Sequence, residues 1–351
     1  MKKVKLVDIC NPKQWKTIPT SKLLDEGYPV YGANGIIGYY GEYNHEKPTV
    51  AVTCRGATCG AINITVPRAY ITGNAMCLDD VNNDIEIDYL YYCLKQYDFN
   101  NVISGSAQPQ ITRQGLEKIY ISVCSHDEQV EMVNRLKSVE KVIKLRKQEL
   151  QSLDDLIKAR FVELFGTYPG NDKGWNTGNI RDVVSEVRYG SSRPAVDGGR
   201  YPYLRMNNIT YGGELDLSDT KRIDIPDNEL AKCTVRRGDV LFNRTNSKEL
   251  VGKTCVYNRD EMMVLAGFVI RVRVNEKVLP EFLSAFLNTD FSKKMLLGMC
   301  KTAIGQANIN AQELQNIGLY VPPIDLQQEF VDFKKQVDKS KIITQRITLT
   351  S

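Results

Sequence analysis

The sequence predicts an α/β (α+β) fold, in which two similar globules with mixed β-sheet are joined by long antiparallel coiled-coil helices in a pseudo-two-fold arrangement. Three observations favour it. Residues 125–165 contain no Gly or Pro, short β-like runs alternate with turn-rich loops on both sides of that stretch, and the segment before it recurs near the C-terminus. A chain of 351 residues has room for two or three domains of ordinary size.

The stretch 125–165 has the start, the end and the periodicity of one long helix. Ser125 and Glu128 form a capping-box pattern, and Gly166 is the residue type that tolerates the left-handed turn after a helix. Apolar residues dominate a seam whose positions alternate steps of four and three. The seam consists of Met132, Leu136, Val139, Ile143, Arg146, Leu150, Leu153, Ile157, Arg160 and Leu164. A helix about 60 Å long needs a partner helix; the alternative is a core helix of one large domain.

The first globule, residues 1–122, is expected to contain short strands and one helix. Strands are predicted at 49–52 and 61–65, where β-branched residues lie between turn formers. The spacing of Leu90 and Leu94 predicts a helix over 87–99. Residues 28–35 are expected to form a turn-rich loop, and a strand at 120–123 leads into the spacer helix, residues 123–166.

The second globule, residues 167–322, repeats this order. Strands at 239–242 and 253–257 flank a polar turn, and residues 265–270 correspond to residues 71–76. Leu283 and Leu287 correspond to Leu90 and Leu94. The distal helix, 323–351, is expected to be short or truncated, because β-branched residues that favour helix less are frequent after Ser340.

A constant offset of 198 residues relates the ends of the two globules. Nine identical pairs occur over 24 residues: Gln108/Gln306, Ile111/Ile309, Gln114/Gln312, Leu116/Leu314, Ile119/Ile317, Val123/Val321, Asp127/Asp325, Gln129/Gln327 and Glu131/Glu329. The match runs without gaps from globule into helix. The chain is therefore interpreted as a tandem duplication of a globule followed by a helix.

The composition excludes several classes of protein. The net charge is only +4, so nucleic-acid binding would have to come from local Arg and Lys. Nine cysteines with two histidines and no CxxC pair argue against a zinc site. The sequence has neither an apolar run long enough to span a bilayer nor a signal peptide, and an odd cysteine count favours a reduced, cytoplasmic setting.

Catalytic motifs are also missing from the sequence. Neither GxGxxG nor the phosphate loop GxxxxGKS/T occurs, and no Asn-Pro-Pro-Tyr motif of an adenine methyltransferase is found. A Ser-His-Asp set would have to recruit His45 or His126, both of which are expected to be exposed to solvent. The sequence therefore predicts a chain that binds without catalysing.

Four motifs, each weak alone, are specific in combination. They are YPVYGANGIIG at 28–38, YITGN at 70–74, GDVLFNRTNS at 238–247, and GQANIN at 305–310, which leads to Val321-Pro322-Pro323 and Gln327-Gln328-Glu329. In these motifs the chain resembles the specificity subunits of type I restriction-modification systems, over essentially its whole length.

The resemblance implies a function, partners and cofactors. Each globule would be a target-recognition domain that reads one half of a split sequence in double-stranded DNA, and the helices would set the spacing and dock two methyltransferase subunits. Those subunits would bind S-adenosylmethionine, while a motor-nuclease subunit would use ATP and Mg. By this resemblance, the chain itself holds no cofactor and no metal.

Candidate DNA-binding residues are those whose side chains suit base edges or phosphates. The candidates are, in the first globule, Tyr31, Asn34, Arg55, Thr58 and Ser106, and, in the second, Arg188, Tyr189, Ser191, Ser192, Arg193, Arg205, Asn207, Asn208, Asn243, Arg244, Asn246, Ser247 and Lys248. Instead of contacting DNA, Tyr31 could pack in the core. Arg244 and Lys248 could instead lie in a solvated turn, paired with Glu249.

Two rival functions remain open at the level of sequence. A self-sufficient DNA methyltransferase or nuclease would modify or cut DNA without partners. A coiled-coil scaffold that binds only protein would show no DNA sequence preference, and the modest net charge keeps this reading open.

Overall fold

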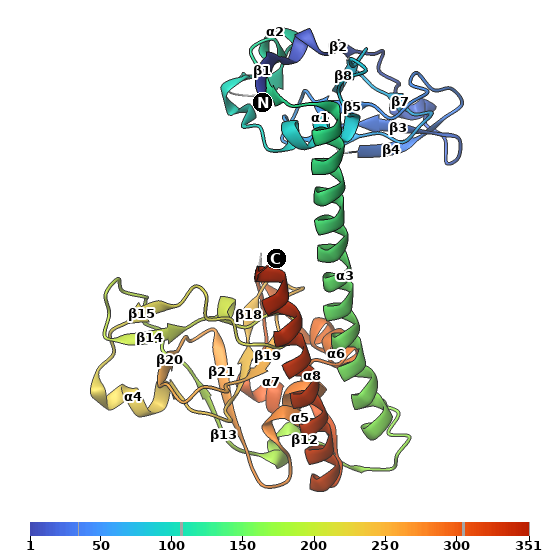
Figure 1. Ribbon diagram of the computed structural model, residues 1–351. Coiled ribbons are helices and arrows are strands. Elements are labelled where there is room, and N and C mark those ends of the chain that lie inside the picture. Colours follow the sequence, from blue (N-terminus) through green and yellow to red (C-terminus); the bar gives the residue numbers. More distant parts are fainter. Residues whose placement is uncertain (34, 106–107, 304–305, 351) are drawn as a thin grey trace. The chain divides into compact units, whose positions relative to one another are not determined.

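The computed structural model describes residues 1–33, 35–105, 108–303 and 306–350, with backbone alone at 301–303, 306 and 345–350. The chain divides into two compact units, residues 1–144 (unit 1) and 145–351 (unit 2). Each unit has its own hydrophobic core. The long helix α3 (His126–Phe165) contributes residues to both units (Figure 1).

Unit 1 is built on two small sheets. Its strands are β1 (Lys2–Lys5), β2 (Asn11–Gln14), β3 (Tyr28–Gly32), β4 (Gly35–Tyr40), β5 (Val50–Thr53), β6 (Ile62–Ile64), β7 (Tyr70–Ile71), β8 (Ala75–Asp79), β9 (Ile103–Ser104), β10 (Gln110–Ile111) and β11 (Tyr120–Val123), and its other helices are α1 (Ile87–Lys95) and α2 (Arg113–Leu116). The sheet orders are β2-β8-β5-β6 and β4-β3-β7. Two-stranded pairs, β1-β11 and β9-β10, complete the unit.

Unit 2 has the same plan with additional elements. Its strands are β12 (Asn176–Asn179), β13 (Val184–Tyr189), β14 (Tyr201–Leu204), β15 (Lys221–Ile223), β16 (Thr234–Val235), β17 (Val240–Asn243), β18 (Thr245–Asn246), β19 (Thr254–Val256), β20 (Met263–Leu265), β21 (Val269–Val274), β22 (Lys301–Ala303), β23 (Gln306–Asn308) and β24 (Gly318–Val321). Its helices are α4 (Asp227–Cys233), α5 (Pro280–Leu287), α6 (Asp290–Met299), α7 (Ala311–Gln315) and α8 (Ile324–Thr350). The sheets run β13-β21-β17-β19, β15-β14-β20-β16 and β18-β23-β22.

The main sheets of the two units share one topology, to which unit 2 adds further strands. In both, a four-stranded antiparallel sheet lies beside a sheet that contains one parallel pair, β3 with β7 in unit 1 and β14 with β20 in unit 2. The strand before each spacer helix pairs with the first strand of its unit, β11 with β1 and β24 with β12. The duplication predicted from the offset of 198 residues is therefore a duplication of the fold, and the predicted α/β (α+β) class is confirmed.

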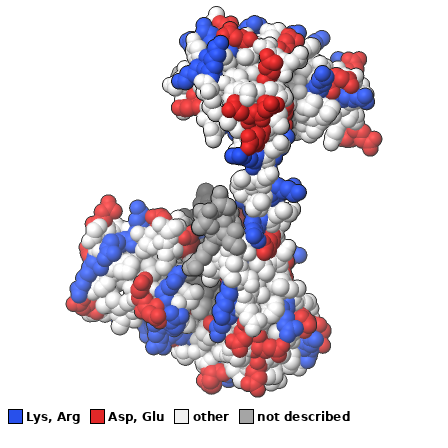
Figure 2. Space-filling view, viewed as in Figure 1, with Lys and Arg blue, Asp and Glu red and all other residues white. Residues whose placement is uncertain are grey.

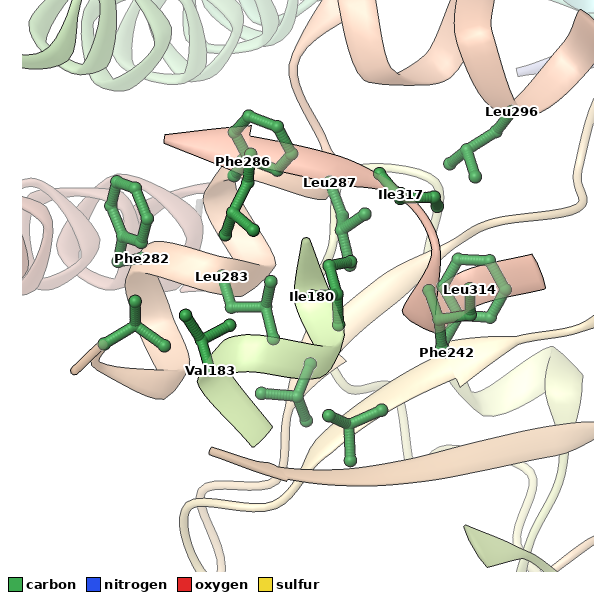
Figure 3. Close-up of a cluster of buried hydrophobic side chains, with 14 of the residues drawn as sticks. Ile180, Val183, Phe242, Phe282, Leu283, Phe286, Leu287, Leu296, Leu314 and Ile317 are labelled. Carbon is green, nitrogen blue, oxygen red and sulfur yellow. The ribbon is translucent and has the colours of Figure 1, made fainter. Parts of the chain in front are cut away.

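The core of unit 2 lies between its four-stranded sheet and its helices. Figure 3 shows Phe242 of β17 facing Leu314, with Phe282 and Phe286 of α5 reaching the same cluster. Helix α3 enters this core at its C-terminal end, where Phe161 and Phe165 pack edge-on against Phe330 of α8. Aromatic contacts of this kind add to the stabilisation that burial provides.

Both ends of α3 follow the predicted signals. The Ser125 backbone N–H donates to Glu128 Oε2 at 3.0 Å, and the Glu128 N–H donates to Ser125 Oγ at 3.4 Å, which completes the capping box. Gly166 has a φ of +80°, a left-handed conformation that glycine adopts without strain. The helix therefore begins and ends where its sequence indicates.

Within unit 2, α3 and α8 pack antiparallel. Arg160 donates to Glu329, whereas Lys341, further along α8, contacts Asp154, earlier on α3. The predicted seam is correct at Leu150, Leu153 and Ile157, which are half-buried. In the last turn Arg160 and Leu164 are also half-buried, but the fully packed residues are their neighbours Phe161 and Phe165, because a straight helix of 3.6 residues per turn drifts away from a strict heptad.

One local prediction is wrong. Residues 28–32 form strand β3 instead of a loop, because Val30 and Tyr31 pair with the parallel strand β7 and are buried by it. The distal helix α8 has 27 residues, against 40 in α3. Its residues 341–350 are helical despite their β-branched side chains, since packing of the buried Lys341 and Thr344 outweighs weak helix propensity. No helix among the described residues combines the length and hydropathy of a membrane-spanning segment.

Candidate nucleic-acid interface

Arg244 is held at the end of β17 by contacts from three segments. Its backbone N–H donates to the Phe268 carbonyl at 3.0 Å, and its Nη1 donates to the Gly267 carbonyl at 3.4 Å. Its guanidinium carbon lies 4.8 Å from the centre of the Tyr189 ring. The Tyr189 hydroxyl in turn accepts from the Ala311 N–H at 2.8 Å. An aromatic platform and a carbonyl therefore orient a guanidinium that has no carboxylate partner in the described part of the chain.

The turn after β17 presents polar side chains in several environments. Asn246 Oδ1 accepts from the Ser247 N–H at 2.9 Å, and Lys248 is exposed. Hydrogen bonds from its own backbone N–H and from Ser247 lower the pKa of Glu249, with a smaller effect from Lys248. The alternative of a turn paired with Glu249 therefore applies to Lys248 and not to Arg244.

Asn243, the last residue of β17, is fully buried. Its amide nitrogen and oxygen have no hydrogen-bond partner among the described residues. Burying an unpaired amide is costly. Asn243 is therefore placed inside the unit, beneath Arg244, and not on the outer surface.

The loop after β13 separates candidates that sequence alone treats alike. Ser191 is buried, where its Oγ accepts from the Arg193 N–H and its carbonyl accepts from the Gly267 N–H. Arg193 makes a bidentate pair with Glu229 of α4, and Arg188 pairs with Glu186. Ser191 is therefore removed from the candidates as a structural residue, while Ser192 is exposed.

Arg205, Asn207 and Asn208 lie after β14, apart from the Arg244 contacts. Asn208 is buried, where its Oδ1 accepts from the Arg205 N–H and its Nδ2 donates to two carbonyls, of Asp216 and Asp219. Arg205 Nη2 bonds the Asp219 carboxylate at 2.9 Å. Asn208 therefore caps its own turn and is removed from the candidates, while Asn207 is exposed.

In unit 1 the structure describes three of the five candidates. Tyr31 is buried, and its hydroxyl accepts from the Val66 N–H at 3.2 Å, so the core-packing alternative is correct. Arg55 and Thr58 are exposed in the turn between β5 and β6. Asn34 and Ser106 lie outside the described residues.

A largely buried charge network supports strand β13, which ends at Tyr189. Arg271, only 2% exposed, pairs with Glu186, while Arg273 pairs with both Glu186 and Asp239. Burial lowers the pKa of Arg271, and the charge of Arg273 lowers it further. Burial alone would raise the pKa of Glu186, but its hydrogen bond from Arg188 and the charges of Arg271 and Arg273 hold it below the ordinary value. The network fixes β13 against β21.

One group of side chains could hold a metal. His45 Nε2, Cys77 Sγ and an Asp79 oxygen lie within 4.8 Å of one another. His45 Nε2 lies 2.9 Å from Asp79 Oδ1 and its Nδ1 lies 2.6 Å from Asn44 Oδ1, so each ring nitrogen is within hydrogen-bond distance of a side-chain oxygen. Burial first, and then the charge of Asp79, raise the pKa of Cys77, which keeps it a neutral thiol. These contacts favour a hydrogen-bonded pair over a metal ligand set.

The prediction that both histidines are exposed is therefore wrong for His45. Its side chain is 9% exposed and packs edge-on against Trp15, whose Nε1 donates to Asp79 Oδ2. The loop that carries His45 folds back along residue Ala69, to which it is bridged. His126 is exposed, as expected.

Sequence reasoning missed two basic residues of unit 2, Lys253 and Lys293. Lys253 begins the predicted strand 253–257, and its alternation with Cys255 and Tyr257, which are buried, was a signal that its side chain points inward. Lys293 lies on α6, which occupies the place of a single three-residue turn, Phe99–Asn101, in unit 1. No pattern in the sequence brings the two lysines together.

The face of the molecule drawn in Figure 2 has no continuous basic patch. Figure 2 shows acidic and basic side chains interspersed over the visible face of each unit. Such a surface favours recognition through a few well-placed groups over attraction by a general field.

The fold and these surfaces define a tandem of two similar α/β units that expose polar and basic side chains on loops. A family model for the type I restriction modification DNA specificity domain matches residues 1–155 and residues 172–350, one match for each copy of the fold. The chain therefore belongs to this family, and the resemblance inferred from its motifs is confirmed.

Individual relatives agree with this membership. The EcoKI specificity subunit of Escherichia coli is 24% identical over 201 residues, covering 56% of this chain and 43% of that protein. The putative MjaX specificity subunit of Methanocaldococcus jannaschii is 26% identical over 168 residues, covering 47% and 39%. The chain therefore spans less than half the length of these relatives.

Solved structures share the fold. The type I restriction-modification S subunit from M. genitalium matches with a TM-score of 0.61 at 13% identity, covering 99% of this chain and 92% of that one. A structure described in connection with assembly and conformational transition of the type I R-M system matches with a TM-score of 0.57 at 15% identity, covering 99% and 93%.

Proposed function

We propose that this chain is the sequence-reading subunit of a type I restriction-modification complex, in which each unit reads one half of a bipartite target in double-stranded DNA. The observation that supports this most directly is that the specificity-domain model matches twice, once on each copy of a duplicated fold. Two copies of one reader, with different surface residues, suit a target whose two halves differ.

The residues around Arg244 support base reading by unit 2. Arg244 has the fixed, forked donor set that pairs with guanine, and Tyr189 restricts its orientation. Asn246 and Lys248 lie in the same turn, where they would flank such a contact. In unit 1, Arg55 and Thr58 occupy the corresponding turn between β5 and β6. Recognition would therefore come from matching turns of the two copies.

The helices would dock the methyltransferase subunits. Apolar seam residues of α3 within unit 1 are exposed, Leu136 at 43%, Val139 at 48% and Ile143 at 38%. An apolar stripe of this kind on a helix favours contact with another helix. Catalysis would belong to the partners: S-adenosylmethionine to the methyltransferase, and ATP with Mg to a motor-nuclease subunit.

The test is methylation in cells. The chain would be co-expressed with the methyltransferase subunits of its own system in a host that lacks adenine methylation, and methylated adenines would be mapped across the genome. The proposal predicts methylation at one split motif, with a fixed gap, that depends on the chain. Methylation without a motif would favour the protein scaffold, and methylation by the chain alone would favour the self-sufficient enzyme.

A further inference from the structure

Lys253, the residue before β19, buries a cationic side chain inside unit 2. It is 7% exposed, and its Nζ donates to the Met206 carbonyl at 2.9 Å. That carbonyl belongs to the short 3₁₀ turn Met206–Asn208 after β14. A carbonyl supplies one acceptor but no negative charge, so it compensates only part of the cost of burying an ammonium group.

Lys293 approaches the same place from α6. Its Nζ donates to the carbonyl of Gly252, the residue before Lys253, at 3.0 Å. It also lies 5.3 Å from the centre of the ring of Tyr211, which is 58% exposed and marks where the site opens to solvent. Burial, and secondarily the charge of Lys253, lower the pKa of Lys293 to about 8. The charge of Lys253 therefore disfavours the charged form of Lys293, whose Nζ is bonded to the residue directly before Lys253.

Acidic side chains of the surrounding segments point elsewhere. Glu214, three residues beyond Tyr211, contacts Lys341 of α8, and Asp290, at the start of α6, contacts Lys158 of α3. Among the described residues neither Lys253 nor Lys293 has a carboxylate within ion-pairing distance. A buried cation and a half-buried cation beside it, without a counter-charge, are unfavourable unless an anion joins them.

The duplicated fold does not require this arrangement. In unit 2 the Asn243 N–H donates to the Lys253 carbonyl and the Gly252 N–H donates to the Asn243 carbonyl, both at 2.8 Å. In unit 1 the Thr53 N–H donates to the Ala61 carbonyl and the Gly60 N–H donates to the Thr53 carbonyl, again at 2.8 Å. Ala61 therefore occupies the position of Lys253, and the same backbone forms without a lysine there.

We propose that Lys253 and Lys293 form a phosphate-binding site, which holds one backbone phosphate of the DNA that unit 2 contacts. The site lies beside the turn that carries Arg244, because β17 and β19 are paired neighbours and Lys253 follows that turn directly. This inference rests on the proposed function and deepens it, since it assigns a sequence-independent contact that sets the register of the base-reading turn.

The first experiment measures the salt dependence of DNA binding by the full chain. The probe is a duplex selected from a random library by the wild-type chain, and the variants are Lys253→Ala, which copies unit 1, and Lys293→Met. Each variant is expected to reduce the slope of log Kd against log salt concentration by about 1. The matched control is Lys294→Met, since Lys294 is the next residue on α6 and is exposed; its slope is expected to stay at the wild-type value.

The second experiment distinguishes DNA phosphate from free phosphate. Amine-reactive labelling near pH 8 is followed residue by residue by mass spectrometry, with Lys294 as the internal reference. The selected duplex, near its Kd, is expected to protect Lys293, while inorganic phosphate at the same phosphate concentration is not. Equal protection by inorganic phosphate would overturn the assignment to DNA, and protection by neither would overturn the site.

The outcomes separate this inference from the proposed function. If the wild-type chain selects a duplex, but Lys253→Ala and Lys293→Met keep the wild-type slope, the phosphate site is wrong and the reader function stands. If the wild-type chain selects no duplex, alone or with its methyltransferase subunits, the proposed function itself fails. A Lys293→Arg variant, which keeps the positive charge, is expected to retain the wild-type slope.

Discussion

Gln129 and Gln327 make the same three hydrogen bonds in two different units. Gln129 Oε1 accepts from the Glu86 N–H, and its Nε2 donates to the Asp84 and Cys124 carbonyls. Gln327 Oε1 accepts from the Leu279 N–H, and its Nε2 donates to the Lys277 and Pro322 carbonyls. Both side chains are fully buried. Each glutamine therefore ties the start of a core helix, α1 or α5, to the junction where the last strand becomes the spacer helix.

Replacing either glutamine is expected to destabilise one unit. Gln129→Ala removes three part-buried hydrogen bonds to backbone groups, each worth about 0.5–1.5 kcal/mol, so a net loss of about 2–4 kcal/mol in the free energy of unfolding is expected. Hydrogen exchange should show faster exchange in α1 and β11 of unit 1, with unit 2 unchanged, and the reverse for Gln327→Ala.

The matched control for the glutamine variants is Gln151→Ala. Gln151 is exposed on α3, where it bonds only Asp155 in the next turn. Its replacement is expected to change stability by less than about 0.5 kcal/mol. Wild-type exchange rates in both Gln129→Ala and Gln327→Ala would contradict a stabilising role for the hydrogen bonds of these two glutamines.

Arg244→Ala is expected to weaken DNA binding selectively. A bidentate contact to a base is worth about 1–3 kcal/mol, and the loss should be confined to the half-site read by unit 2. Titration of duplexes mutated in one half-site at a time measures this. Arg237→Ala is the matched control, because Arg237 is exposed and already pairs with Asp260. Equal loss on every sequence would reassign Arg244 to a phosphate contact, and no loss would remove it from the site.

Unit 2 is expected to lose stability at acidic pH through Glu186. The pKa of Glu186 is lower in the folded chain than its ordinary value of 4.5. A carboxyl with a depressed pKa stabilises the fold above its unfolded pKa, and this contribution disappears as the pH falls from about 4.5 through the folded pKa. Chemical denaturation between pH 3 and 7 checks it. The stability of Glu186→Gln should depend less on pH across that window; an unchanged dependence would exclude Glu186 as a cause.

Lys341 is expected to stabilise the packing of α8 against the rest of unit 2. It is buried, and its Nζ lies 2.5 Å from Asp154 Oδ1, with Glu214 and Asp338 also in reach. Burial alone would lower the pKa of Lys341, but Asp154 and the other two carboxylates raise it above its ordinary value. Lys341→Met should cost about 1–2 kcal/mol, less than a fully buried pair, because the carboxylates are partly exposed.

Hydrogen exchange at the C-terminal turns of α8 measures the effect of Lys341→Met. Exchange is expected to accelerate there while α5 keeps its wild-type rates. Lys339→Met, at an exposed position two residues earlier, should leave the rates unchanged. Equal rates in the two variants would contradict an anchoring role for Lys341.

The fold was largely predictable because its signals are local. The capping box at Ser125 and the apolar spacing of Leu90 and Leu94 both identified helices, and the offset of 198 residues identified the duplication. Strand β3 was missed because its stability comes from pairing with β7, about forty residues away in sequence. The β-branched residues after Ser340 favour helix less, but helix propensity takes no account of the ion pairs of Lys341, which stabilise α8 there. The division of the sequence into four segments stays a prediction.

The site was less predictable because exposure depends on tertiary packing. Ser191 and Asn208 have the same chemistry as Ser192 and Asn207, yet the first two are buried and bonded to backbone groups. The stacking of Arg244 on Tyr189 joins residues on strands that become neighbours only through β21. Which of the remaining candidates read bases stays a prediction.

Selection of duplexes from a random library tests most directly whether each of the two units recognises its own half of a bipartite DNA target. The full chain, alone and with its methyltransferase subunits, would be used to enrich binding sequences. The account predicts two short conserved blocks separated by unconserved bases of one fixed number, with Arg244→Ala relaxing the sequence of one block and not the other. A single uninterrupted block, or no enrichment under either condition, would contradict it.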